Sequence, residues 1–139
     1  MQKHLAAAVL SVALLATASC KSGATRHRVA EGAIGPYSAT VSAGGFHFLA
    51  GKIGELGGSF EDEAESSISR IEEELGFSGL SLADVVSATV YLTDMDRYAD
   101  FNKIYARRFP PPYPARVCVA VAALPAGAQV EVAVIARSK

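Results

Sequence analysis

The sequence has few of the residues from which metal sites and disulfide frameworks are built. Its 139 residues include two cysteines, three histidines and no tryptophan. His4, His27 and His47 are far apart, and none has a cysteine or second histidine at ligand spacing, so no metal site is predicted. With Cys20 and Cys118 as the only cysteines, one intrachain disulfide at most can form.

An excess of charge of either sign is also missing. Thirteen basic and fourteen acidic residues give a net charge of −1, which provides no electrostatic footprint for nucleic acid. The glycine pairs 44–45 and 57–58 do not fit a phosphate-loop pattern, and no serine lies in a glycine-flanked elbow. These absences argue against nucleotide-dependent and serine-hydrolase chemistry.

The first residues form a segment distinct from the rest of the chain. Residues 5–18 are apolar or small, a run too short for a comfortable membrane span but typical of a secretory signal. Thr17-Ala18-Ser19-Cys20 resembles the lipobox of bacterial lipoproteins, which implies cleavage after residue 19 and lipid on Cys20. Lys21 favours the outer membrane, with the protein on its periplasmic face. A plain secretory signal or a retained anchor are the alternatives.

A tether and one domain are predicted after this segment. Residues 20–32 are polar and aperiodic, typical of a flexible tether, and the domain is predicted over 33–139. Alternating and helical apolar periodicities give the order β-β-α-β-α-β-β, an α+β domain. The predicted strands are 38–42, 46–53, 84–93, 115–122 and 130–136, and the predicted helices begin at Phe60 and Tyr98.

The last two strands contain the most informative charges. We expect them to pair as a hairpin around Leu124-Pro125-Ala126-Gly127, and within them only Arg116 and Glu131 are charged. A charge in such a strand needs a partner or a ligand. Either the two form a buried ion pair across neighbouring strands or subunits, or Arg116 binds a substrate carboxylate while Glu131 handles a proton or water. Cys118 is equally open to a structural or a reactive role.

The penultimate strand is apolar on both faces. Val117 and Val119 point one way, whereas Cys118 and Ala120 point the other. Two helices can cover only one face of the predicted sheet. The second face is therefore predicted to be buried against other subunits.

The hairpin sequence resembles the signature of the Rid family, the reactive intermediate deaminases, also called RidA/YjgF. The residues that carry the resemblance are PAR at 114–116, Cys118 two residues later, and ALP-x-GA-x-VE at 123–131. Further matches lie at 32–37, 49–53, 90–94, Asn102 with Tyr105, and 135–136. The resemblance covers roughly residues 32–137 and therefore the whole predicted domain.

This resemblance implies a chorismate-mutase-like fold, a homotrimer and active sites between subunits. It implies hydrolysis of enamines and imines such as 2-aminoacrylate to a 2-keto acid and ammonia, without metal or organic cofactor. Carried over residue by residue, it implies carboxylate binding by Arg116, water activation by Glu131 and a main-chain contact at Cys118. The remaining site residues that it implies line the cleft or allow close backbone approach: Tyr37, Asn102 and Gly51.

Three positions depart from the family pattern and leave the substrate open. Ala50 and Lys52 stand where Ser and Gln are common, and Val117 replaces Ser or Thr after the arginine. A non-catalytic lipoprotein that binds small carboxylates is the alternative function. Nuclease activity, also associated with the family name, is disfavoured by the acidic balance of the chain.

Overall fold

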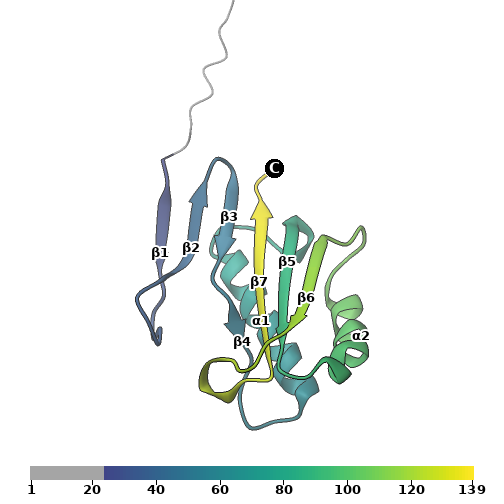
Figure 1. Ribbon diagram of the computed structural model, residues 1–139. Helices are drawn as coiled ribbons and strands as arrows, with labels where there is room; N and C mark the ends of the chain where they lie inside the picture. Colours follow the sequence, from purple (N-terminus) through teal and green to yellow (C-terminus); the bar gives the residue numbers. More distant parts are fainter. Residues whose placement is uncertain (1–23) are drawn as a thin grey trace, which may run out of the picture.

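The computed structural model describes residues 24–139 as one mixed sheet with two α-helices on one side (Figure 1). The predicted signal segment and Cys20 lie outside the described residues. The strands are β1 (Arg26–Val29), β2 (Ser38–Ala43), β3 (Phe46–Leu49), β4 (Lys52–Ile53), β5 (Val85–Leu92), β6 (Ala115–Ala120) and β7 (Val130–Arg137). The helices are α1 (Phe60–Gly76) and α2 (Tyr98–Arg108). The predicted α+β class and element order are confirmed, with one additional strand at the start and with the predicted strand 46–53 divided into β3 and β4.

The order of strands in the sheet is β1-β2-β3-β7-β5-β6, and β4 pairs with β7 beside this path. Alternate residues of β7 face the helices, so Val130, Val132 and Val134 are buried while Glu131 lies on the opposite face. The core is formed between these valines and the apolar stripe of α1, which includes Ile68.

Helix α1 begins and ends where its sequence directs. Ser59 caps the N-terminus by accepting from the backbone N–H of Asp62, whose carboxylate in turn accepts from the N–H of Ser59. Acidic residues in the first turn complement the helix dipole. No helix within residues 24–139 has both the length and the apolar character needed to cross a membrane.

Strand β1 lies within the segment predicted as a flexible tether, and this part of the prediction is wrong. Arg26–Val29 pairs antiparallel with β2, and the Arg28 guanidinium donates twice to the carboxylate of Glu74 on α1. The strand escaped detection because its sequence, RHRV, is polar, as is common for an edge strand that must not pair with another chain.

The predicted hairpin of the last two strands is also wrong. β5 lies between them, pairing parallel with β6 and antiparallel with β7. Strand β5, helix α2 and strand β6 form a crossover unit, and such a connection places its two strands side by side and parallel. The segment 124–129 therefore crosses the end of β5 to connect β6 with β7, which are not neighbours in the sheet.

The sheet face away from the helices is apolar and uncovered in one protomer. Val117 is 57% exposed, Phe48 is 45% exposed and Val119 is 38% exposed. A monomer seldom leaves a row of such side chains in water. The prediction that both faces of β6 are apolar is confirmed, while the subunit that would cover the second face stays a prediction.

Candidate functional site

Arg116 lies on the helix-facing side of β6, where α2 holds its side chain. Its Nη2 donates to Oδ1 of Asn102 at 2.6 Å and to the Tyr98 hydroxyl at 3.3 Å. The guanidinium carbon stands 4.6 Å from the centre of the Tyr105 ring. A planar cation fixed on one edge by an amide and stacked on an aromatic ring can offer its remaining N–H groups to a carboxylate.

A cavity of about 340 Å³ opens beside this arginine. It is lined by Asn102, Tyr105, Tyr113 and Arg116 together with Ala106 and Pro114. The sequence prediction that Arg116 and Asn102 share a site is consistent with this arrangement. We call Arg116, Asn102 and this cavity the arginine half-site.

Tyr105 was not predicted as more than a family match, yet it is an unusual residue of the arginine half-site. It is only 5% exposed, and its buried hydroxyl has no hydrogen-bond partner among residues 24–139. Burial raises the pKa of Tyr105 to about 12, although nearby Arg116 acts in the opposite direction. The hydroxyl therefore stays protonated at neutral pH.

Cys118 follows Arg116 by two residues and shares its face of β6. Its side chain is partly buried and packs against the core. Burial raises the pKa of the Cys118 thiol, and Arg116 only partly opposes that effect. The thiol therefore stays protonated at neutral pH, which favours a structural side chain over a reactive thiolate.

Glu131 lies on the other face of the sheet, against Gly51. A methyl group added at Gly51 would stand 1.8 Å from Oε1 of Glu131, so only glycine allows the carboxylate to take this position. Burial raises the pKa of Glu131. No cation within residues 24–139 forms an ion pair with it. A desolvated carboxyl group of this kind is suited to take up and return a proton.

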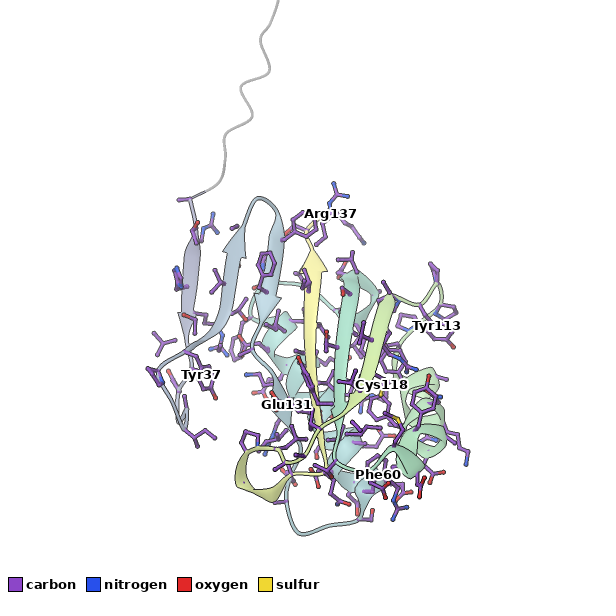
Figure 2. The ribbon with its side chains drawn as sticks, viewed as in Figure 1. Tyr37, Phe60, Tyr113, Cys118, Glu131 and Arg137 are labelled. Carbon is purple, nitrogen blue, oxygen red and sulfur yellow. The ribbon has the colours of Figure 1, made fainter. Side chains whose placement is uncertain are left out.

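Glu131 opens into a cavity of about 710 Å³. Tyr37, Ala50 and Gly51 line it, as do Lys52 and the apolar residues Ile34 and Pro125. Tyr37 belongs to the loop that joins β1 and β2, whereas Glu131 projects from the start of β7 (Figure 2). We call Glu131, Gly51 and this cavity the glutamate half-site.

The two half-sites do not meet within one protomer. Arg116 on β6 lies opposite Ala88 on β5, and Ala88 in turn lies opposite Val134 on β7. Glu131 on β7 lies opposite Tyr91 on β5. The two charges therefore differ by about 10 Å along the strands and by two strands across, and they lie on opposite faces. The alternative that Arg116 and Glu131 form a buried ion pair within one chain is wrong.

Lys52 has a role that the sequence did not indicate. Its Nζ lies 3.4 Å from Oε2 of Glu74, a carboxylate only 3% exposed that also accepts from Arg28 and from the Thr40 hydroxyl. These donors outweigh the effect of burial and lower the pKa of Glu74 to about 2. The sequence does not single out Glu74 as a buried residue, because it follows other acidic residues on α1.

Glu63 is a second buried glutamate that sequence reasoning missed. It is 2% exposed, and its carboxylate accepts from the backbone N–H groups of Gln129 and Val130. This contact ties α1 to the residue that precedes Glu131. The start of β7 is thereby fixed, which positions the glutamate half-site.

Metal binding finds no geometric support in the part of the chain that the structure describes. Within residues 24–139, no three histidine, cysteine or acidic side chains come together as a possible metal site. The functional chemistry available is that of a guanidinium, a carboxyl with raised pKa and two tyrosine-lined cavities. Such groups can bind a carboxylate and activate a water.

Comparison with known proteins places this geometry in context. Residues 27–138 match the family model described as Endoribonuclease L-PSP. A RutC family protein of Pyrococcus horikoshii is 41% identical over 110 residues, covering 74% of this chain and 87% of the relative. The putative reactive intermediate deaminase TdcF of Escherichia coli K12 is 35% identical over 116 residues, covering 77% and 90%.

A solved structure agrees with the fold. RidA from an Antarctic Psychrobacter bacterium superimposes with a TM-score of 0.74 at 37% identity, covering 76% of this chain and 91% of that one. The same fold thus occurs in a protein named RidA.

Proposed function

Because the chain belongs to the Endoribonuclease L-PSP family, which includes the Rid proteins, we propose that it hydrolyses reactive enamines and imines. The substrate class is the 2-aminoacrylate and 2-iminopropanoate type, and the products are a 2-keto acid and ammonia. The observation that carries the proposal is Glu131, a carboxyl of raised pKa that has no ion-pair partner among residues 24–139 and is held against Gly51 in a large cavity.

The mechanism uses groups that the chain itself supplies. Arg116, oriented by Asn102, binds the substrate carboxylate with its free N–H groups. Glu131 accepts a proton from a water as that water adds to the electrophilic imine carbon, and it returns the proton to the nitrogen. In the resulting carbinolamine the hydroxyl proton passes to the nitrogen through Glu131, the C–N bond breaks, ammonia leaves, and the hydroxyl oxygen becomes the keto group. An imine is already electrophilic, so orientation of water and carboxylate provides most of the needed acceleration.

We propose that the complete site forms between subunits of a homotrimer. The glutamate half-site and the arginine half-site lie on opposite faces of one sheet, so a single substrate can reach both only if two copies contribute. The uncovered apolar face, with Val117 and Phe48, provides the surface on which copies can pack. A molar mass of three protomers in solution tests the assembly.

The direct test of the activity is ammonia and 2-keto acid release from 2-aminoacrylate generated in the assay by a separate enzyme. Arg116→Ala loses the carboxylate anchor, and its rate falls on the order of 100-fold or more. Arg107→Ala, which removes an exposed arginine on α2, is the matched control and retains the wild-type rate. Equal rates for wild type and Arg116→Ala would contradict the proposal.

We further propose that the protein acts outside the cytoplasm, anchored by lipid on Cys20. The support is the lipobox-like sequence before that cysteine. Wild type is expected in the membrane fraction of the producing bacterium, and Cys20→Ser in the soluble fraction. Wild type found free in the cytoplasm would overturn this assignment.

Nuclease activity is not part of the proposal, although the family description contains that word. The net charge of −1 gives the chain no general attraction for a polyanion. RNA incubated with the purified protein is therefore expected to remain intact, and cleavage lost in Glu131→Gln would show otherwise.

A further inference from the structure

Lys52 and Arg70 lie where the cavity of the glutamate half-site meets a second cavity. The second cavity measures about 360 Å³, and Lys52 and Arg70 line both it and the cavity of Glu131. Tyr37 is also common to both linings. A ligand that fills the first cavity can therefore extend a side chain along Tyr37 towards these two cations.

The charge of Lys52 is not required by its neighbour Glu74. Three closer bonds already satisfy that carboxylate: two from Arg28, at 2.7 and 2.5 Å, and one from the Thr40 hydroxyl, at 2.5 Å. The contact from Lys52 is the longest, at 3.4 Å. Arg28 alone balances the charge of Glu74, so the ammonium of Lys52 remains as a surplus positive charge beside the cavity.

Arg70 adds a second positive charge, and its position is fixed. Its Nη1 donates to the carbonyl oxygens of Ile53 and Gly54, at 2.8 and 3.0 Å. Within residues 24–139 it has no carboxylate at ion-pair distance. A guanidinium bound only to neutral carbonyls keeps its full charge for an anion.

The acidic groups near these cations do not cancel them. Glu31 and Glu73 also line the cavities, and both are exposed, as is Arg70, so water screens all three charges. Glu131 is half-buried and lines the first cavity but not the second. Lys52, whose side chain is 20% exposed, therefore offers an anion the least screened free positive charge where the two cavities meet.

We propose that Lys52 and Arg70 bind a second anionic group of the substrate. The inference rests on the proposed function and deepens it. The preferred substrate class is then the imine of a dicarboxylic 2-keto acid. Arg116 of the adjacent copy holds the carboxylate next to the imine carbon, and Lys52 with Arg70 holds the carboxylate at the far end.

Two stable ligands that differ only in the distal group test this inference. 2-Oxoglutarate and 2-oxopentanoate have five carbons each, and the first ends in a carboxylate where the second ends in a methyl group. Wild type is expected to bind 2-oxoglutarate about tenfold more tightly by calorimetry, the difference that one charged hydrogen bond supplies. Lys52→Gln keeps length and removes the charge, so it reduces this preference to about twofold or less.

A second variant and a control keep the result interpretable. Arg70→Gln is expected to lower 2-oxoglutarate affinity in the same direction, while Lys139→Gln, an exposed lysine at the C-terminal end, leaves both affinities unchanged. A thermal unfolding curve for Lys52→Gln checks that Arg28 and Thr40 keep Glu74 in place. Equal wild-type affinities for the two ligands, or a preference that Lys52→Gln retains, would overturn the inference.

Failure of this inference is distinguishable from failure of the proposed function. Turnover of 2-aminoacrylate together with equal affinities for the two ligands would remove the second anion site and leave the deaminase. Absence of turnover with a Lys52-dependent preference for 2-oxoglutarate would leave a dicarboxylate-binding site and remove the deaminase. The binding measurement requires no catalysis, so each result stands alone.

Discussion

Glu74 is buried and Glu131 is half-buried, yet their surroundings shift the pKa values of the two carboxyl groups in opposite directions. Glu74 accepts bonds from Arg28 and Thr40, and its pKa is lowered to about 2. Glu131 has no cation within ion-pair distance among residues 24–139, and burial raises its pKa. A satisfied carboxylate stabilises the fold, whereas an unsatisfied one costs stability and is kept available for a proton.

Glu131→Gln should cause the largest loss of activity, because Glu131 is the proposed catalytic base. Removing the base is expected to slow ammonia release from 2-aminoacrylate by 10² to 10⁴-fold. The pKa of Glu131 is raised in the folded state, so its burden on stability grows as the pH increases. Unfolding at neutral pH should accordingly require slightly more urea than in wild type, a gain of up to about 1 kcal/mol.

The matched control for this variant is Glu61→Gln on the exposed face of α1, which should change neither rate nor stability. A variant Glu131→Gln that keeps the wild-type rate, or that unfolds much more easily, would place Glu131 with Glu74 among the structural residues.

Glu74→Gln should show the opposite pattern. Loss of the charge weakens the contacts of Arg28 and Thr40 and lowers the free energy of unfolding by about 2–3 kcal/mol. Turnover per folded molecule should fall far less than in Glu131→Gln. Urea unfolding with circular dichroism provides the measurement, and Glu72→Gln, an exposed neighbour on α1, is the control.

The pH dependence of this effect follows from the lowered pKa. A normal glutamate titrates near 4.5, whereas Glu74 titrates near 2 in the folded protein. Its contribution is complete above about pH 4.5 and is lost as the pH falls towards 2. Wild type and Glu74→Gln should therefore converge in stability in acid, and a gap that persists at pH 2 would contradict the assignment.

Tyr105→Phe extends the comparison to the arginine half-site, with the smallest effect. The buried Tyr105 hydroxyl has no partner among residues 24–139, so its removal relieves a desolvation cost. The free energy of unfolding should rise by about 1 kcal/mol. Tyr113→Phe, at an exposed tyrosine, is the control and should change nothing. A loss of stability in Tyr105→Phe would reveal a partner for its hydroxyl.

Much of the fold was predictable because it follows from local periodicity. The stripe from Phe60 along α1 and the alternation in β5 and β7 fixed the type of each element. The polar strand β1 was not predictable, since its stability comes from Arg28 meeting Glu74, 46 residues away in sequence. The insertion of β5 between β6 and β7 likewise depends on the crossover through α2 and on no local signal.

The site was predictable as a set of residues but not as an arrangement. Arg116 and Glu131 stood out as charges in apolar strands, and the family resemblance supplied Asn102 and Gly51. Strand order then separated the two charges onto opposite faces, which no pattern of alternation could reveal. The sequence did not indicate that Lys52 and Arg70 lie close together, because they belong to different elements and share only the lining of a cavity.

The proposed site joins Arg116 of one copy to Glu131 of another. The direct measurement mixes Arg116→Ala and Glu131→Gln proteins, unfolds and refolds them together, and records ammonia release from 2-aminoacrylate. In randomly mixed trimers about a quarter of the interfaces carry both intact residues, so activity should return to about a quarter of wild type. Activity no greater than that of the two variants refolded separately, with mixed trimers demonstrated by mass, would contradict the claim.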